Sequence, residues 1–106
     1  MLISKVMRIE LKKFGTTLVS RQAGKEAYSA FLPTLREAKS ESIEIDFSGV
    51  TTFSPSWGDE FLSPLLDGYG ESLVLVHTQE NPSVKLTVEF LGGIKGRGFV
   101  TRNETR

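Results

Sequence analysis

Polar and apolar residues alternate at the start of the chain, and this period of two predicts β-strands. In Lys5–Leu11, every second residue is apolar and would lie on one buried face. Phe14-Gly15 predicts a turn. Thr16–Ser20 is then expected to be a second strand that forms a hairpin with the first.

Two later segments are also predicted to be strands. Ser42–Phe47 alternates again and places Glu44 and Asp46 on the face opposite its apolar residues. If that face is covered, both acids need partners. Leu73–His77 is an almost continuous apolar run, which is typical of a central strand with both faces covered.

Two segments have apolar residues at steps of three and four, the spacing of one helix face. The first begins at Arg21 and is interrupted by Pro33, so we expect this helix to kink or split. The second contains Pro64, where we expect a bend, and ends at Gly68–Gly70. The two apolar faces consist of Ala23, Ala27, Phe31, Leu35 and Ala38, and of Trp57, Phe61, Leu62, Leu65 and Leu66.

Residues 83–91 carry conflicting signals. Their alternation of apolar and polar residues favours a strand. Against this, Asn81-Pro82-Ser83 is typical of a helix start and Gly92-Gly93 of a helix stop. On a helix, Leu86 and Phe90 would lie away from the other apolar residues of the segment. Periodicity alone favours the strand.

The predicted order is strand, strand, helix, strand, helix, strand and then the ambiguous segment, which indicates an α/β domain. We expect a small mixed sheet of about four strands with helices packed on it, and right-handed crossovers between parallel strands. The chain of 106 residues is large enough for one core, which we assign to residues 1–93. Residues 94–106 are expected to be a basic, glycine-containing tail with poor order.

The composition excludes several classes of protein. A hydrophobic content of 39% and a charged content of 25% are ordinary for a globular protein in water. No apolar run approaches the roughly 20 residues that span a bilayer. The absence of cysteine excludes disulfides, thiol nucleophiles and thiolate metal sites. The first residues have no signal-peptide core, so we expect the protein to be cytoplasmic.

The net charge is zero but is unevenly placed. Residues 95–106 carry four basic residues and one acidic residue (+4 − 1 = +3), so residues 1–94 carry 9 − 12 = −3. A basic tail can contact nucleic acid or an acidic partner. However, the rest of the chain lacks the basic surface with interleaved aromatic residues that nucleic-acid binding requires. We therefore expect no nucleic-acid partner.

Residues 46–60 join a predicted strand to a predicted helix. Ser54 before Pro55 fits an N-cap with proline at the first helical position. Alternatively, Ser56 is the cap, with Asp59 in a variant of the capping box. Trp57 is expected to pack in the core. The first amides of such a helix point outward without helical partners, so this helix start is a natural binding or modification site.

This region resembles the STAS-like domains of undefined function, which are similar to a trimmed STAS fold of anti-sigma-factor antagonists. Three segments carry the resemblance, which covers roughly residues 5–92; they are Phe14-Gly15 with Leu18 and Ser20-Arg21, Ile45–Val50, and Phe53–Phe61. The resemblance implies a STAS-like fold and a bacterial cytoplasmic domain for protein–protein interaction. It also implies that the last element is a helix after Asn81-Pro82.

In STAS antagonists, the loop after the third strand and the helix that follows it bind an ATPase of the histidine-kinase type. This partner phosphorylates a serine at the helix start, and the contact is then lost. The resemblance assigns the docking region to residues 47–62 and aligns Pro55 with the phosphoacceptor, which leaves Ser56, and next Ser54, as candidates for phosphorylation. The predicted partner-binding residues are Ser48, Thr51, Thr52, Ser54, Ser56 and Asp59.

A competing interpretation is a small hydrolase or transferase. His77 and Asp46 both end predicted strands, and the carboxyl ends of strands can meet at one edge of a sheet. The chain has neither a G-x-S-x-G elbow nor a G-x-G-x-x-G loop, and its single histidine makes a zinc site improbable. We therefore expect a non-enzymatic regulatory module without a cofactor or metal. A pocket that joins His77 to a carboxylate and a serine would favour the enzyme.

Overall fold

The computed structural model describes residues 5–103 as an α/β domain, and the predicted fold class is confirmed. Four strands form one sheet in the order β1 (Val6–Glu10), β3 (Ser42–Asp46), β5 (Leu73–Val76) and β6 (Val100–Arg102). Two short strands, β2 (Thr17–Leu18) and β4 (Thr52–Phe53), form a separate pair. The helices are α1 (Arg21–Ala38), α2 (Pro55–Tyr69) and α3 (Pro82–Lys95), with short 3₁₀ helices η1 (Leu11–Phe14) and η2 (Gly70–Ser72).

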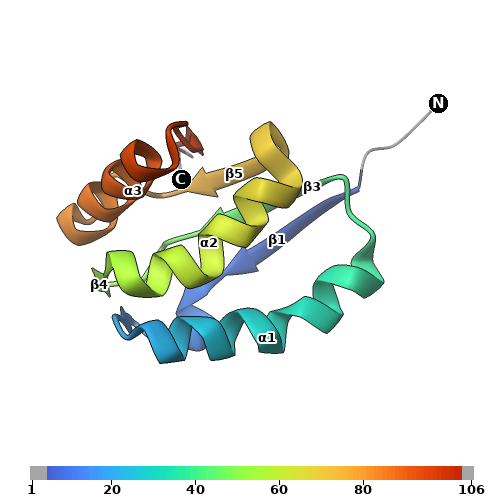
Figure 1. Ribbon diagram of the computed structural model, residues 1–106, viewed down its shortest axis with the longest axis horizontal. Helices are drawn as coiled ribbons and strands as arrows, with labels where there is room; N and C mark the ends of the chain where they lie inside the picture. The colour runs from blue at the N-terminus through green and yellow to red at the C-terminus, as the bar shows by residue number, and fades with distance from the viewer. Residues whose placement is uncertain (1–4, 104–106) are drawn as a thin grey trace.

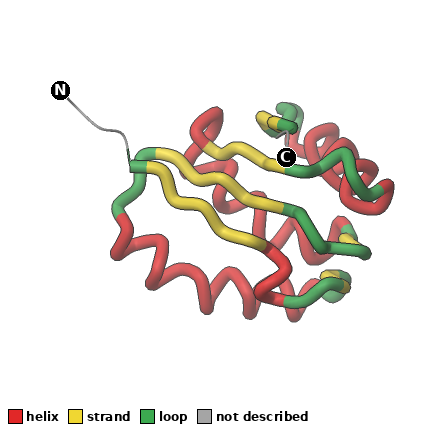
Figure 2. The backbone as a smooth tube through the Cα atoms, turned by 180° about the vertical axis from the view of Figure 1, so that it is seen from behind, coloured by secondary structure: helices red, strands yellow, loops and turns green. Residues whose placement is uncertain are grey.

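The three α-helices lie on one face of the four-stranded sheet (Figures 1 and 2). The strands follow one another across the sheet in chain order, and every neighbouring pair is parallel. Each crossover therefore advances in the same direction, and right-handed crossovers then place their helices on the same side. The carboxyl ends of β1 and β3 and the start of α2 lie at one end of the domain (Figure 1).

The core lies between the sheet and these helices, and it is rich in aromatic residues. Trp57 exposes only 1% of its surface, so the prediction that it packs in the core is confirmed. Its ring stacks on Phe61 with 5.1 Å between centroids, and Phe53 lies edge-on at 5.9 Å. The first turns of α2 are therefore fixed to the core through large side chains.

The predicted hairpin between the first two strands is wrong. After β1 the chain turns away from the sheet in η1, and β2 pairs with β4 in parallel, with Leu18 opposite Phe53. β1 pairs with β3 instead. Consequently the four-stranded sheet is parallel and not mixed. The alternating pattern identifies a strand, but burial against distant elements selects its partner.

Both helices that contain an internal proline are continuous. α1 runs through Pro33 and α2 through Pro64; of the two outcomes expected for the first helix, a kink or a split, the split does not occur. Each proline removes one backbone donor. Phe31 and Leu35, on either side of Pro33, are both buried, and their packing holds the two halves of α1 against the same core.

The last predicted element is a helix, as the resemblance implied and against the alternation of its residues. The side-chain oxygen of Asn81 caps it by accepting hydrogen bonds from the amides of Ser83 (2.8 Å) and Val84 (3.2 Å). α3 continues to Lys95, and β6 then joins the sheet beside β5. Residues 94–103 are therefore not the poorly ordered tail that we expected; residues 104–106 lie outside the described part of the chain.

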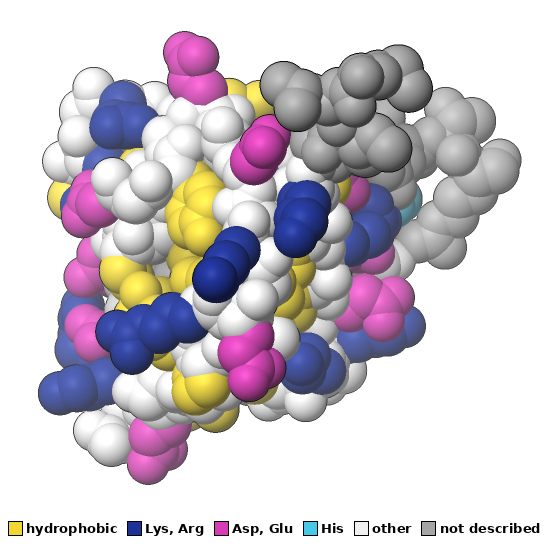
Figure 3. Space-filling model, turned by 90° about the vertical axis from the view of Figure 1, so that its right-hand side faces the viewer, with side chains coloured by type: hydrophobic (Ala, Val, Ile, Leu, Met, Phe, Trp, Pro, Cys, Tyr) yellow, Lys and Arg dark blue, Asp and Glu magenta, His cyan; other side chains and the backbone are white. Residues whose placement is uncertain are grey.

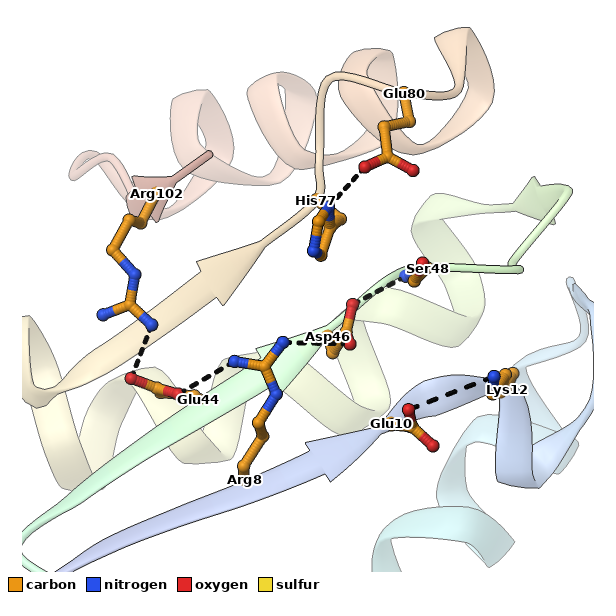
Figure 4. A network of polar contacts seen from close by, with 9 residues as sticks. All are labelled: Arg8, Glu10, Lys12, Glu44, Asp46, Ser48, His77, Glu80 and Arg102. Atoms are coloured by element: carbon orange, nitrogen blue, oxygen red, sulfur yellow. Dashed lines mark hydrogen bonds and ion pairs between the residues drawn. The ribbon is translucent and has the colours of Figure 1, made fainter. Parts of the chain in front are cut away.

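The face of the sheet away from the helices carries a charged network (Figure 4). Arg8 of β1 donates hydrogen bonds to Glu44 and Asp46 of β3, both at 3.1 Å. Arg102 of β6 donates to Glu44 at 2.6 Å. Both acids of β3 thus have cationic partners from other strands. These are the partners that we expected Glu44 and Asp46 to need if their face of the sheet is covered.

Candidate partner-binding site at the start of helix α2

Ser54 is the N-cap of α2, with Pro55 at the first helical position. Its hydroxyl accepts a hydrogen bond from the amide of Trp57 at 3.3 Å and donates one to the carbonyl of Val19 at 2.5 Å. The expectation that a serine caps this helix is confirmed, and the cap is Ser54 rather than Ser56. Both hydrogen-bonding functions of the Ser54 hydroxyl are therefore used within the domain.

A pair of alanine variants separates the roles of the two serines. Ser54→Ala is expected to lower the free energy of unfolding by about 1–2 kcal/mol because the cap is lost. Ser56→Ala should change it by less than about 0.5 kcal/mol, as is usual for a surface substitution. Urea denaturation of both variants measures the difference; equal losses would contradict this assignment of the cap.

The backbone just before α2 is held by α3. The amide of Phe53 donates a hydrogen bond to the hydroxyl of Ser83 at 3.0 Å. The carbonyl of Phe53 accepts hydrogen bonds from the hydroxyls of Ser83 (3.2 Å) and Thr87 (2.6 Å). These contacts fix the direction in which the chain enters α2, so the side chains of its first turn are displayed in one orientation.

The Ser56 side chain is half-buried and lines a hollow of about 140 Å³ between the start of α2 and α3. Within residues 5–103, its hydroxyl makes no hydrogen bond to another protein group. Pro55 beside it is exposed. The hollow is lined by Arg21, Pro55, Ser56, Asp59, Phe90, Leu91 and Ile94. Ser56 is thus the serine at this helix start whose hydroxyl is not committed to the fold.

Arg21, the first residue of α1, joins the two helix starts. Its guanidinium donates hydrogen bonds to Asp59 at 3.0 Å and to Glu60 at 2.7 Å. The hydroxyl of Ser63 donates to the other oxygen of Asp59 at 2.7 Å. The bond from Ser63 and then the bond from Arg21 lower the pKa of Asp59, and the bonds to Asp59 and Glu60 raise the pKa of Arg21.

The lowered pKa of Asp59 gives stability a pH dependence with a definite sign. The ionised carboxylate is favoured in the folded state, so its contribution is present above the unfolded pKa near 3.8 and is lost as the pH falls through the lower folded value. Because the Asp59 side chain is 40% exposed, solvent screening limits this to about 0.5 kcal/mol. Asp59→Asn should flatten the acid limb of a pH–stability curve by that amount; a steeper limb would contradict the argument.

The other predicted binding residues lie on the loop and strand before α2. Thr51 and Thr52 are both exposed. The hydroxyl of Thr51 donates to the carbonyl of Thr16 at 3.0 Å, and Thr52 pairs with Thr17 of β2. Ser48 is half-buried, and its amide donates to Asp46 at 2.9 Å. The structure therefore groups Ser54, Ser56 and Asp59 at the helix start and places the other three earlier on the chain.

The sequence did not identify the apolar surface beside this helix start. Leu86, Phe90 and Ile94 of α3 are 66%, 54% and 63% exposed, and their spacing of four places them in one row. We call these three residues the α3 stripe. Phe90 and Ile94 line the same hollow as Ser56. The sequence did contain a signal for this surface. If residues 83–91 form a helix, Leu86 and Phe90 lie away from its buried face.

The strand-end residues of the competing enzyme interpretation both contact other groups of the domain. His77 is buried, and its Nδ1 contacts the carboxylate of Glu80 (Figure 4). Asp46 is bound to Arg8 and to the amide of Ser48. Neither His77 nor Asp46 lines the hollows of about 510, 340 and 140 Å³.

Charge at the opposite end of the domain is mixed. Figure 3 views the end at which α1 and α2 finish, and its lysines and arginines are interspersed with aspartates and glutamates around small apolar areas. A nucleic-acid-binding face would gather its basic side chains. The visible part of this end has no such cluster.

A comparison with protein families identifies the family of this chain. The family model described as STAS-like domain of unknown function (DUF4325) matches residues 23–84, more than half of the 106 residues. The chain belongs to this family of STAS-like domains. The matched residues include most of α1, all of β3 and β5, and the serines and Asp59 at the start of α2, whereas Arg21 and the α3 stripe lie outside the match. Searches of curated proteins and of solved structures found no match.

Two further observations concern membranes and metals. Among residues 5–103, no helix has both the length and the apolar character that a bilayer span requires. The same residues contain no group of three histidine or acidic side chains placed to hold a metal ion.

Proposed function

We propose that this STAS-like domain is a non-enzymatic regulatory module that docks a protein partner through residues 47–62. The partner is an ATPase of the histidine-kinase type, and phosphorylation of Ser56 weakens the contact. The observation that carries this proposal is the uncommitted hydroxyl of Ser56 in a hollow bordered by exposed apolar residues of α3. The proposal places the protein in the cytoplasm, where such a partner has ATP.

Support for a protein partner comes from the α3 stripe. Exposed aromatic and aliphatic side chains beside a rigid helix start supply the apolar centre of an interface, and polar residues form its rim. Arg21, Asp59 and Glu60 border this centre with charges of both signs. Such a rim favours a partner of matched shape over a partner that binds by charge alone.

Support for Ser56 over Ser54 comes from their hydrogen bonds. A phosphate on Ser54 would break its bond to the carbonyl of Val19 and place negative charge beside that oxygen. A phosphate on Ser56 breaks no hydrogen bond within residues 5–103 and lies close to Arg21. Arg21 would then be drawn from Asp59 and Glu60 toward the phosphate, so the charges that face the partner would be rearranged.

The test is incubation of the domain with ATP and the histidine-kinase-type ATPase encoded nearest to it, followed by mass spectrometry of residues 51–66. We expect one phosphate on this peptide, retained in Ser54→Ala and lost in Ser56→Ala. A stable complex without phosphate would support docking and contradict regulation by phosphorylation of Ser56. An unmodified peptide together with no complex would remove both halves.

Ser56→Asp is expected to weaken partner binding about tenfold while the melting temperature changes by less than about 2 °C. Titration calorimetry and thermal unfolding measure the two effects. The matched control is Ser29→Asp, which places the same charge on an exposed serine of α1 and should leave binding unchanged. A large fall in melting temperature for Ser56→Asp alone would mean that Ser56 supports the fold.

A further inference from the structure

A second site lies away from the start of α2, between α3 and the edge strand β6. All three residues of β6 are exposed, so α3 does not cover this strand fully. The gap is a hollow of about 510 Å³, within the range of sites that hold small molecules. Its lining comes from the chain after β5, one side of α3, the loop that follows α3, and β6 itself.

The polar lining of this hollow includes charged side chains that form no ion pair within residues 5–103. Lys85 and Glu89 lie one turn apart on α3, and Arg97 lies on the loop after it. Among the ion pairs of residues 5–103, none involves any of these three side chains. The charges sum to +1, which favours an anion. The guanidinium of Arg97 lies beside Gly70, at an adjoining hollow of about 340 Å³, so its charge stands at the edge of the larger hollow.

The rest of the lining is shaped to admit a ligand close to the backbone. Gly92, Gly93, Gly96 and Gly98 all border the hollow. A Cβ atom added to Gly93, Gly96 or Gly98 would meet no atom within 4 Å, so open space lies beside these positions. Val88 and Phe99 provide apolar surface, and Thr78, Gln79 and Thr101 provide hydrogen-bonding groups.

We propose that this hollow binds a small organic anion, a molecule with one phosphate or carboxylate group and a body that has both an apolar face and polar groups. Lys85 binds the anionic group, and Arg97, whose guanidinium lies on the Gly70 side, adds positive charge at the edge of the hollow. Val88 and Phe99 contact the apolar face, and Thr78, Gln79 and Thr101 hydrogen-bond to the polar groups. Glu89 limits the ligand to a low negative charge. The proposal is independent of partner docking, because none of these residues lies in 47–62 or in the α3 stripe.

The test is NMR titration of the ¹⁵N-labelled domain with two probes, AMP for the phosphate and benzoate for the carboxylate. Adenosine and benzamide are the uncharged controls. We expect one of the two anions to shift the amide signals of Gly93, Gly96 and Gly98 with a dissociation constant below about 1 mM. The uncharged control should shift them at least tenfold more weakly. The probe that binds identifies the anionic group.

Two charge variants are expected to change the affinity for the anion in opposite directions. A merely structural role of these residues would not produce this result. Lys85→Gln should weaken binding of the anion about fivefold or more, and Glu89→Gln should strengthen it about twofold or more. Both side chains are exposed, so both variants should fold. A shift of the same sign in the two variants would overturn the proposal.

A pair of glycine variants tests the location. Gly93→Leu puts a side chain into the open space beside α3 and should abolish the shifts. Gly68→Leu makes the same change at an open position of α2 outside the hollow and should leave them intact. The proposal is overturned if neither probe shifts the loop glycines at 10 mM, or if Gly93→Leu binds as well as Gly68→Leu does.

Discussion

Gly24→Ala is expected to destabilise the domain by about 2–3 kcal/mol, although alanine is the better helix former by about 1 kcal/mol. A Cβ atom at Gly24 would lie 2.6 Å from the carbonyl oxygen of Trp57 and 2.9 Å from its Cα. Both atoms belong to the backbone of α2, which the buried Trp57 ring anchors in the core. The clash is relieved only if α1 and α2 move apart, which would open the core between them.

The matched control is Gly68→Ala on the exposed face of α2. An added Cβ there meets no atom within 4 Å, so the variant should gain about 0.5–1 kcal/mol from helix propensity alone. Urea denaturation of both variants measures the two effects with the same chemical change. If Gly24→Ala is neutral or stabilising, the close approach of α1 to α2 is not a constraint on the fold.

Phe90→Ser is expected to weaken partner binding about thirtyfold, equivalent to about 2 kcal/mol for a central interface residue. Phe90 is 54% exposed at the centre of the α3 stripe and lines the hollow that contains Ser56. Since much of its ring already faces water, its removal should change the free energy of unfolding by less than about 1 kcal/mol. Titration calorimetry with the ATPase measures the loss of binding.

The control for this prediction is Val6→Ser. Val6 is an apolar residue of equal exposure, 54%, and it lies on β1, away from the helix face of the sheet. Its replacement should leave partner binding within about twofold of the wild type. If both variants bind as the wild type does, the partner does not contact α3; if both lose binding, the effect is not specific to the stripe.

Local patterns predicted most of the elements because they depend on neighbours in the chain. The alternation in Ser42–Phe47 and the step of three or four after Arg21 each record which side of an element is buried. Single residues indicated the candidate caps, namely Ser54 or Ser56 for α2 and Asn81 for α3, and the structure shows Ser54 and Asn81 in these positions. The order of these elements was enough to indicate an α/β domain.

The candidate site was predicted only in part, because some of its residues are close in sequence and others are far apart. The strand-to-helix junction and its serines could be read from residues 46–60 alone. Arg21 could not be identified as the partner of Asp59 and Glu60, because 38 and 39 residues separate it from them. The exposure of Phe90 depends on which side of α3 faces the core, and this is decided only when α3 packs against α2 and β4.

The sequence by itself determined where β1, β3, β5, α1 and α2 form, that α2 begins close to Ser54-Pro55, and which family the central block resembles. The tertiary structure decided that β2 pairs with β4, that Ser56 and not Ser54 keeps a free hydroxyl, and that a hollow opens between α3 and β6. The physical reason is the range of the interactions. Hydrogen bonds within a helix and at its cap join residues close in sequence, whereas strand pairing, ion pairs between helices and unfilled space depend on how distant segments pack.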